Sequence, residues 1–442
     1  MIRLFRAVGV AALSLSLGLP LLPQPLAAAA DTSRAASSSV TDRRDTTDRR
    51  DTMDRRDTMD RRDATDPKAA ARLRLPAPTG PYAVGRSTLP LADHSRRDPW
   101  VPTATSRELM VGLYYPARRG TGTSVRYATV EESRHLIKAQ GWENLVTPEA
   151  LSAMAVHSRT DARPAPGTYP LLVVSPGFSA PRYSLTSLAE DLASRGYVVA
   201  TVDHAYESTG TAFPGGRILT CAACEQVYGT EDGFRRATVG RGQDVSFVLD
   251  QLTGHQPAWR YSHLIDEKRI GMAGHSLGGA SAVSAMARDS RIRAGVNMDG
   301  AFQDPVPAGG LGSRPFLMLG TDNEVHRPGG RDRTWDLAWS RLDGWKRWLT
   351  VAGADHLTFS DAPVIVDALT TPTTDTTNTT AASPAPQPPL SGQRSVALTR
   401  GYVAAFFDQH LRHLPQRLLQ GPTKDNPEVK FHSPAPAAPS LR

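Results

Sequence analysis

Apolar runs of four to ten residues recur along the chain between residues 107 and 351, separated by segments with helical spacing. Runs this short, without regular polar alternation, are typical of strands buried on both faces of a parallel sheet. The runs cover residues 107–116, 170–174, 197–202, 269–273, 294–298, 315–319 and 348–351. Their alternation with helices predicts an α/β fold with a mostly parallel central sheet and helices on both faces. Residues 396–414 have the apolar spacing of a closing amphipathic helix.

The first 30 residues depart from this pattern and have the features of a secretory signal. Arg3 and Arg6 precede an apolar stretch over residues 7–22, and small residues follow at 27–30. A positive start, an apolar core and a small-residue end are the parts of a cleaved signal peptide. Because no cysteine lies near the cleavage site, a lipid anchor is not expected. We therefore expect a soluble, secreted protein.

Two further segments lack the residues needed for a hydrophobic core. Residues 31–72 contain a six-residue repeat, Asp-Arg-Arg-Asp-Thr-Thr/Met, which begins at Asp42 and ends with a decayed copy at Asp60. A polar period of six fits neither a helix nor a strand, so we predict a disordered linker, with a cell-wall tether as the alternative. Residues 370–391 are rich in Thr and Pro, which predicts a flexible loop. The remainder, residues 73–442, is expected to form a single folded domain.

Composition excludes several classes of protein. The chain has 442 residues, of which 40% are hydrophobic and only two are cysteines, so a wholly disordered chain and a disulfide scaffold are both excluded. The formal net charge is +7, but residues 31–68 carry ten basic and ten acidic side chains, and no dense basic block occurs elsewhere. We therefore expect no nucleic-acid partner. Abundant Ala, Pro and Gly, with Arg preferred over Lys, indicate a bacterial source.

The segment Gly274-His275-Ser276-Leu277-Gly278 carries the clearest chemical signal. An apolar strand leads directly into it, and a helix of small residues follows. This is the strand–turn–helix pattern of a nucleophile elbow, in which serine occupies a strained turn and its neighbours must be small. Ser276 is therefore predicted to be a nucleophile, and a tight structural turn is the alternative.

A serine hydroxyl needs a base, and the base needs an orienting acid. In α/β hydrolases the chain order is serine, acid, histidine, so the base must lie downstream of the elbow. His356 fits best because it lies in the loop beyond the last predicted strand. His326 comes too early, next to the preceding strand, and His410 and His413 lie on the terminal helix.

Two aspartates are candidates for the acid. Asp299 follows the strand after the elbow helix, and Asp322, with Glu324 beside it, follows the next strand. The position of the acid in most α/β hydrolases favours Asp322. The residues alone leave both candidates open.

From about residue 75 onward the chain resembles the plasma-type platelet-activating factor acetylhydrolases and their secreted bacterial lipase and esterase relatives. The matching segments are PAPTGPYAVG, DHSRRDPWVP, RELMVGLYYPA, GHSLGGA, GVNMDGAF, VAGADHLTFSD and RGYVAAFFDQHL. The resemblance implies an α/β-hydrolase fold and a catalytic triad of Ser276, His356 and Asp299, with Asp322 as the alternative acid. It also implies short-acyl lipid esters as substrates and no metal or organic cofactor.

The predicted oxyanion hole requires two backbone N–H groups that face the developing negative charge. The residue after the nucleophile, Leu277, supplies one of them. The other is expected from the loop after the run at 170–174, and the family resemblance points to Phe178. Relatives commonly have His-Gly in this loop where this chain has Pro176-Gly177, a difference that concerns the support of the loop more than the donor itself.

Two residue pairs have simpler interpretations. Asp203 and His204 end a predicted strand, where hydrogen bonding within the loop is the simpler interpretation and substrate contact the alternative. They do not make a metal site, because no third ligand has suitable spacing. Cys221 and Cys224 are expected to form a local disulfide in an exported protein.

These observations predict a secreted serine hydrolase that cleaves carboxylic esters. Its partners are expected to be small-molecule or lipid esters, with at most peripheral contact to a lipid surface and a monomeric state. A polyester or a cell-wall ester is an alternative substrate on the same scaffold. The third hypothesis is an inactive surface-binding protein, against which the complete set of Ser276, Asp299 and His356 argues.

Overall fold

A computed structural model describes residues 73–370 and 389–434 of the chain. The predicted signal peptide, the repeat and most of the Thr/Pro-rich segment lie outside the described residues. All described residues belong to one compact unit.

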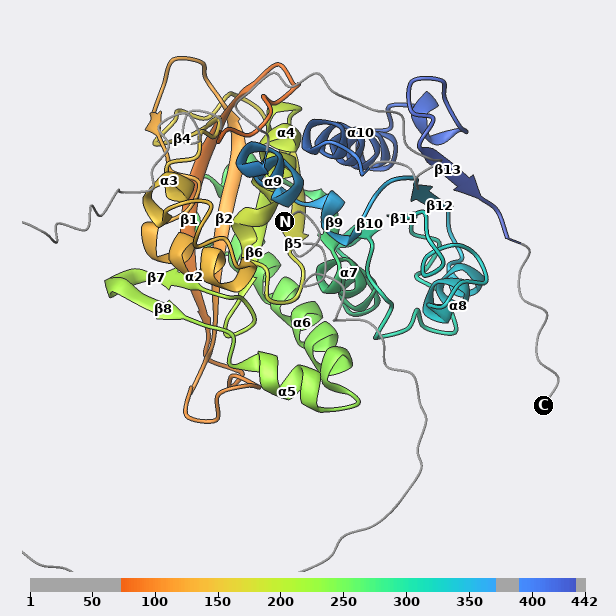
Figure 1. Ribbon diagram of the computed structural model, residues 1–442, viewed down its shortest axis with the longest axis horizontal. Coiled ribbons are helices and arrows are strands. Elements are labelled where there is room, and N and C mark those ends of the chain that lie inside the picture. The colour runs from red at the N-terminus through yellow and green to blue at the C-terminus, as the bar shows by residue number, and fades with distance from the viewer. Residues whose placement is uncertain (1–72, 371–388, 435–442) are drawn as a thin grey trace, which may run out of the picture. The chain divides into compact units, whose positions relative to one another are not determined.

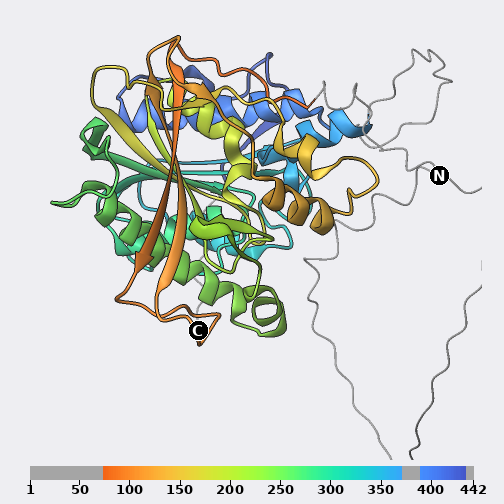
Figure 2. The ribbon, with the colours of Figure 1, turned by 90° about the vertical axis from the view of Figure 1, so that its left-hand side faces the viewer.

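The centre of the fold is a mixed sheet (Figures 1 and 2) whose strands run in the order β13-β12-β11-β10-β9-β5-β6-β2-β1-β4-β3. From β12 to β6 all neighbours are parallel, and antiparallel pairs occur at both edges. The strands are β1 (Ala83–Asp93), β2 (Arg107–Ala117), β3 (Thr123–Ser124), β4 (Ser158–Thr160), β5 (Tyr169–Ser175), β6 (Val198–His204), β9 (Ile265–His275), β10 (Ile292–Met298), β11 (Phe316–Thr321), β12 (Lys346–Val351) and β13 (Val429–His432). The short strands β7 (Thr211–Phe213) and β8 (Arg217–Leu219) form a separate hairpin. The α/β fold expected from the sequence is confirmed.

Helices cover both faces of this sheet (Figures 1 and 2). They are α2 (Val130–Gln140), α3 (Pro148–Ser152), α4 (Thr186–Ser194), α5 (Ala223–Gly229), α6 (Gly233–Thr253), α7 (Leu277–Arg288), α8 (Arg333–Arg341), α9 (Ala362–Thr370) and α10 (Gly392–Leu411). Short 3₁₀ turns are η1 (Arg182–Leu185), η2 (Pro214–Gly216), η3 (Ser262–Leu264), η4 (His356–Phe359) and η5 (Arg417–Leu419). Among the described residues, no helix is long and apolar enough to cross a membrane.

The two faces of each central strand belong to different cores. Leu171 and Val173 of β5 pack in a cluster with α6, α7 and α8, whereas Leu172 and Val174 pack in a cluster with α4 and α10. Successive side chains of a strand point to opposite faces, so a strand between two helical layers must be apolar at every position. This is why the central strands appear in the sequence as continuous apolar runs.

The parallel strands bring the predicted chemistry to one edge of the sheet. Ser276, Asp299 and His356 follow the carboxyl ends of β9, β10 and β12, and Phe178 lies in the loop after β5. Because parallel strands end at the same edge, residues far apart in the sequence become neighbours there.

Candidate active site

Ser276 lies in a sharp turn between β9 and α7. Its backbone has φ 53° and ψ −125°, a conformation that costs energy for a residue with a side chain. An ideal Cβ on Gly274 would lie 2.2 Å from the carbonyl carbon of Gly278, and one on Gly278 would lie 2.0 Å from the carbonyl oxygen of Ser175. The two flanking glycines are therefore required by close backbone approach, which is the geometry of a nucleophile elbow.

His356 forms hydrogen bonds with two of the predicted site residues. Its Nε2 lies 2.9 Å from Ser276 Oγ, and its Nδ1 lies 2.7 Å from Asp299 Oδ2. The Asp299 side chain is only 2% exposed, whereas that of His356 is 40% exposed and reaches the surface. This arrangement can transfer a proton from the serine hydroxyl to an imidazole that a buried carboxylate orients.

The alternative acid, Asp322, does not contact His356. Its carboxylate receives hydrogen bonds from Arg327 and Thr350 and pairs with Lys430 at 2.5 Å. The geometry thus joins Asp299, and not Asp322, to the histidine and serine. The catalytic roles of these residues remain a prediction.

A second histidine shares Asp299. His326 Nδ1 lies 2.8 Å from Asp299 Oδ1, and the Thr321 N–H donates to the same oxygen at 2.7 Å. Burial alone would raise the pKa of Asp299, but His326 and His356 hold it well below its usual range. Burial alone would lower the pKa of His326, but the charge and hydrogen bond of Asp299, together with Asp332, raise it to about 9.

His275, next to the serine, supports the His356 backbone. Burial and the neighbouring His356 lower the pKa of His275 to about 3, so its ring is neutral at physiological pH. Its Nε2–H donates a hydrogen bond to the carbonyl oxygen of His356 at 2.6 Å. Sequence reasoning missed both supporting histidines: it assigns no role to His275, and it considers His326 only as a base.

The two amides predicted to form the oxyanion hole lie beside the serine. Leu277 is the first residue of α7, so its N–H has no acceptor within the helix. An added Cβ on Gly177 would lie 3.3 Å from Ser276 Cβ, which places the loop that contains Phe178 directly against the nucleophile. Within the described part of the chain, neither the Leu277 nor the Phe178 N–H has a hydrogen-bond acceptor. Their role as oxyanion donors remains a prediction.

Asp203 and His204 are buried beneath this loop. The Asp203 carboxylate pairs with Arg182, and His204 Nε2 lies 3.0 Å from Ser175 Oγ. Their exposed fractions of 1% and 2% leave no surface for a substrate, which agrees with internal hydrogen bonding. The predicted Cys221–Cys224 disulfide is confirmed. The described residues contain no group of three or more metal-ligating side chains close enough to share an ion.

Three aromatic side chains lie next to the predicted oxyanion loop. The rings of Phe178, Tyr228 and Phe234 meet edge to face, with centroid separations of 5.4–5.7 Å. Tyr228 is 52% exposed, and Phe178 and Phe234 also pack against the cluster that contains Leu277. The three rings therefore form an aromatic cluster beside the predicted oxyanion loop, with Tyr228 reaching the surface.

Comparisons with known proteins identify a family and several esterase relatives. The sequence profile of the family described as platelet-activating factor acetylhydrolase, isoform II, matches residues 68–214 and 238–383. A probable 1-alkyl-2-acetylglycerophosphocholine esterase from Arthroderma benhamiae is 30% identical over 385 residues, which cover 81% of this chain and 93% of that protein. A bis(hydroxyethyl) terephthalate hydrolase from Streptomyces coelicolor is 27% identical over 167 residues, 37% of this chain and 42% of its own.

Among solved structures, a ferulic acid esterase from Streptomyces cinnamoneus is similar, with a TM-score of 0.70 and 41% identity. The similarity covers 81% of this chain and 99% of that esterase. The fold and these relatives together define the protein as a carboxylic ester hydrolase of the α/β-hydrolase fold. The chain belongs to the platelet-activating factor acetylhydrolase isoform II family, as its sequence motifs indicated.

Proposed function

We propose that this protein is a secreted serine esterase that forms an acyl-enzyme at Ser276. The observation that carries this proposal is the continuous hydrogen-bond chain from Ser276 Oγ through His356 to Asp299, at 2.9 and 2.7 Å. Nucleophile, base and orienting acid in this order make up the catalytic unit of serine hydrolases.

In the proposed mechanism, His356 Nε2 takes the proton of Ser276 Oγ as this oxygen attacks the ester carbonyl carbon. The carbonyl oxygen becomes an oxyanion and accepts hydrogen bonds from the Leu277 and Phe178 N–H groups. The imidazolium then returns the proton to the departing alcohol, which leaves an acyl-Ser276 ester. Water repeats the sequence and releases the carboxylic acid. Asp299 keeps the Nδ1–H tautomer in place and stabilises the transient imidazolium.

For the substrate, we propose short-acyl lipid esters of the 2-acetylglycerophosphocholine type. The family match and the relative from Arthroderma benhamiae support this class. A monomer in at most peripheral contact with a lipid surface would suffice for such a substrate.

Esters of aromatic acids are the second candidate. The aromatic cluster of Phe178, Tyr228 and Phe234 beside the oxyanion loop favours them, because an aromatic acyl group can stack there. The similar ferulic acid esterase and the terephthalate-ester relative support the same class, which also includes aromatic polyesters.

The decisive experiment combines variants with a substrate series. We expect Ser276→Ala and Asp299→Asn to lose about 10³-fold or more in kcat, whereas Asp322→Asn stays within about 3-fold of the unaltered enzyme. A severe loss in Asp322→Asn with a mild one in Asp299→Asn would overturn the assignment of the acid. If a fluorophosphonate failed to modify Ser276, the inactive surface-binding hypothesis would be favoured instead.

The substrates to compare are a 2-acetyl phospholipid, p-nitrophenyl esters of increasing acyl length, methyl ferulate and bis(hydroxyethyl) terephthalate. Short-acyl specificity predicts a kcat/KM that is highest for acetyl and falls with chain length. Preference for methyl ferulate, together with its loss in Tyr228→Ala and Phe234→Ala, would support the aromatic class. Secretion is tested by the mass of the protein recovered from bacterial culture medium, which we expect to start near residue 31.

A further inference from the structure

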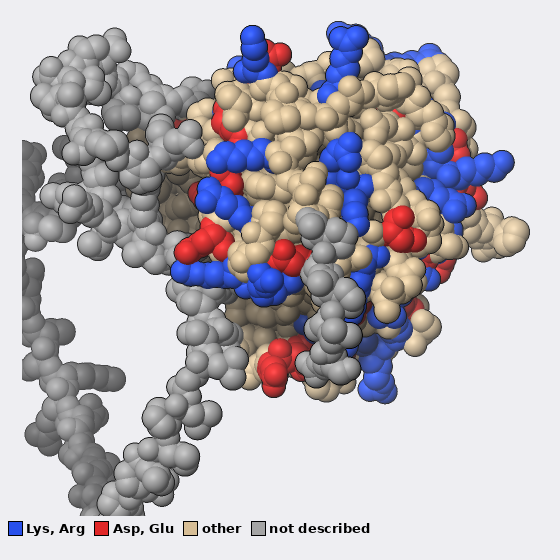
Figure 3. All heavy atoms as spheres, turned by 90° about the vertical axis from the view of Figure 1, so that its right-hand side faces the viewer, with Lys and Arg blue, Asp and Glu red and all other residues tan. Residues whose placement is uncertain are grey.

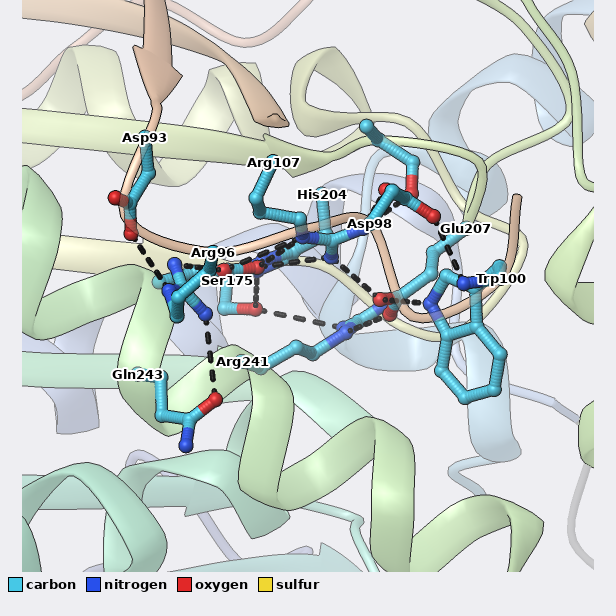
Figure 4. Close-up of polar contacts among 12 residues, drawn as sticks. Asp93, Arg96, Asp98, Trp100, Arg107, Ser175, His204, Glu207, Arg241 and Gln243 are labelled. Atoms are coloured by element: carbon cyan, nitrogen blue, oxygen red, sulfur yellow. Dashed lines mark hydrogen bonds and ion pairs between the residues drawn. The ribbon is translucent and has the colours of Figure 1, made fainter. Parts of the chain in front are cut away.

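Figure 4 shows a network of largely buried charged side chains, one of which, Arg241, contacts the predicted oxyanion loop. Arg107 and Arg241 are each 1% exposed and pair with Glu207, at 2.7 and 2.8 Å. Arg107 also pairs with Asp98 and Asp244, and Asp244 accepts a hydrogen bond from His204 Nδ1. Removing so many charges from water is costly, and well-packed apolar residues would often be at least as stable. A specific geometric role would account for retaining them.

The network contacts the loop through Arg241, which α6 contributes. Its Nη1 donates to the carbonyl oxygen of Pro176 at 2.5 Å, and its Nη2 to that of Gly177 at 3.5 Å. Pro176 has no N–H group, so its carbonyl oxygen is its only backbone atom that can form a hydrogen bond. The sequence has Pro176-Gly177 where relatives commonly have His-Gly, and the hydrogen bonds from Arg241 hold the loop at this position.

The Gly177 carbonyl and the Phe178 N–H belong to the same peptide unit. Peptide units are planar and almost always trans, so their C=O and N–H groups point in opposite directions. A carbonyl held toward Arg241 therefore directs the Phe178 N–H away from Arg241. The same loop runs beside the nucleophile, where a Cβ on Gly177 would lie 3.3 Å from Ser276 Cβ.

Glu207 strengthens this arrangement from two sides. Its carboxylate holds Arg241 at 2.8 Å and accepts a hydrogen bond from Trp100 Nε1 at 2.9 Å. Its backbone carbonyl accepts from the Ser179 N–H at 2.9 Å, just beyond Phe178. Burial alone would raise the pKa of Glu207, but Arg241 and Arg107 hold it below its usual range, so the carboxylate stays ionised.

We infer that Arg241 is a positioning residue that sets the orientation of the Phe178 N–H in the oxyanion hole. This inference rests on the proposed serine-esterase function. Arg241 does not touch the reacting atoms; it acts through the Pro176 and Gly177 carbonyls. By orienting the Phe178 N–H, Arg241 stabilises the transition state more than the bound substrate. A misoriented donor weakens binding of the oxyanion more than binding of the neutral ester.

The test compares Arg241→Gln and Arg241→Lys with Arg96→Gln as the matched control. Arg96 also pairs with Asp244, at 2.8 Å, but contacts no atom of the oxyanion loop. We expect Arg241→Gln to lose about 10²-fold in kcat, as when an oxyanion donor is lost, with KM within about 3-fold. Affinity for an alkyl trifluoromethyl ketone, which adds to serine as a tetrahedral adduct, should fall by a similar factor. Arg96→Gln should change neither quantity by more than about 2-fold.

Circular dichroism and fluorophosphonate titration establish the folded and active fraction of each variant. A folded Arg241→Gln enzyme with unchanged kcat, or with unchanged ketone affinity, would overturn the inference. If Arg241→Gln does not fold, the test rests on Arg241→Lys, which keeps the positive charge beside Glu207. We expect Arg241→Lys to lose about 10-fold in kcat at constant KM. An unchanged kcat in Arg241→Lys would overturn the inference. Full activity in Ser276→Ala would instead refute the proposed function, so the two failures are distinguishable.

Discussion

Asp299 binds two histidines at once, one with each carboxylate oxygen. His356 contacts Oδ2 at 2.7 Å and extends toward solvent, whereas His326 contacts Oδ1 at 2.8 Å and is 5% exposed. The His326 ring lies against Trp335, with centroids 4.5 Å apart, and its Nε2 lies 3.7 Å from Asp332. Two carboxylates around one buried ring favour its charged form. The carboxylate of the proposed triad acid is therefore also bound by a charged His326, through the oxygen that does not contact His356.

The charge on His326 should make stability depend on pH. Its pKa in the folded protein is about 9, against 6.5 for a free histidine, so its stabilising contribution is complete below pH 6.5 and is lost as the pH rises toward 9. The shift corresponds to at most about 3 kcal/mol. We expect the unfolding free energy of the unaltered protein, measured in urea relative to His326→Gln, to fall by up to that amount between pH 6.5 and 9. Parallel pH curves for the two proteins would contradict a charged His326.

Sequence reasoning identified the residues of the proposed triad but not the residues that hold them in position. Ser276 was identifiable because a strained elbow demands small neighbours, and His356 because chain order and strand ends constrain its position. Asp299 needed the family resemblance, since two successive strands both end in aspartate. Nothing local marks the site roles of Arg241 and His326: the Pro176 carbonyl and the Asp299 carboxylate that they contact lie 65 and 27 residues away in the sequence, and only the folded sheet brings them together.

At the level of elements, hydrogen bonds connect the loop that carries His356 to the start of α4. Asp361, two residues beyond η4, accepts hydrogen bonds from the Ser187 N–H at 3.1 Å and the Tyr127 hydroxyl at 3.2 Å. Its own N–H donates to the Ser184 carbonyl at 2.8 Å. These bonds join the β12–α9 connection to η1 and α4, on the side of the sheet opposite α7.

Asp361 is predicted to weaken the fold above neutral pH. Burial raises its pKa to about 7, against 3.8 in the unfolded chain, so its contribution to stability is complete below pH 3.8 and declines as the pH rises to 7. The shift corresponds to at most about 4 kcal/mol. Asparagine keeps an acceptor for the Ser187 N–H but cannot ionise. We expect the unfolding free energy of Asp361→Asn, measured by chemical denaturation, to rise relative to that of the unaltered protein between pH 4 and 7. A difference between the two unfolding free energies that does not vary with pH would disprove this explanation.

The elements that the sequence revealed are those with buried surroundings. All seven predicted runs coincide with β2, β5, β6, β9, β10, β11 and β12, and the closing helix coincides with α10. The strand β1 was missed because it lies near the sheet edge, where several of its positions are exposed and Pro90 interrupts the apolar pattern. The four-residue β13 was missed because only one of its residues is buried. Edge strands carry a weak apolar signal, so their pairing is decided by tertiary contacts.

At the level of the whole molecule, the net charge of +7 does not mark a binding surface on the face drawn in Figure 3. There, Lys and Arg side chains are interspersed with Asp and Glu rather than gathered into one patch. Many arginines are engaged internally: Arg107, Arg182 and Arg241 are buried in ion pairs. Each of these arginines is matched by at least one buried carboxylate, so the pairs add no net positive charge, and the formal charge count by itself does not locate a binding surface.

The segment of residues 31–68, which contains the repeat, allows a direct test of how far catalysis is confined to the described part of the chain. Every residue assigned to the proposed mechanism lies within residues 178–356, and residues 31–68 carry ten basic and ten acidic side chains with no net charge. Deleting residues 31–68 should therefore leave kcat and KM for a soluble p-nitrophenyl ester within about 2-fold, because no group that binds, orients or reacts is removed.

The same deletion separates a spacer from a cell-wall tether. A spacer predicts equal retention of the full-length and deleted proteins on purified peptidoglycan, at low and high salt alike. A tether that binds through its alternating charges predicts retention of the full-length protein alone, weakening as salt screens those charges over distances of about 10 Å at 0.1 M ionic strength. A large drop in soluble-ester kcat after the deletion would refute both interpretations, since it would make the repeat part of the catalytic unit.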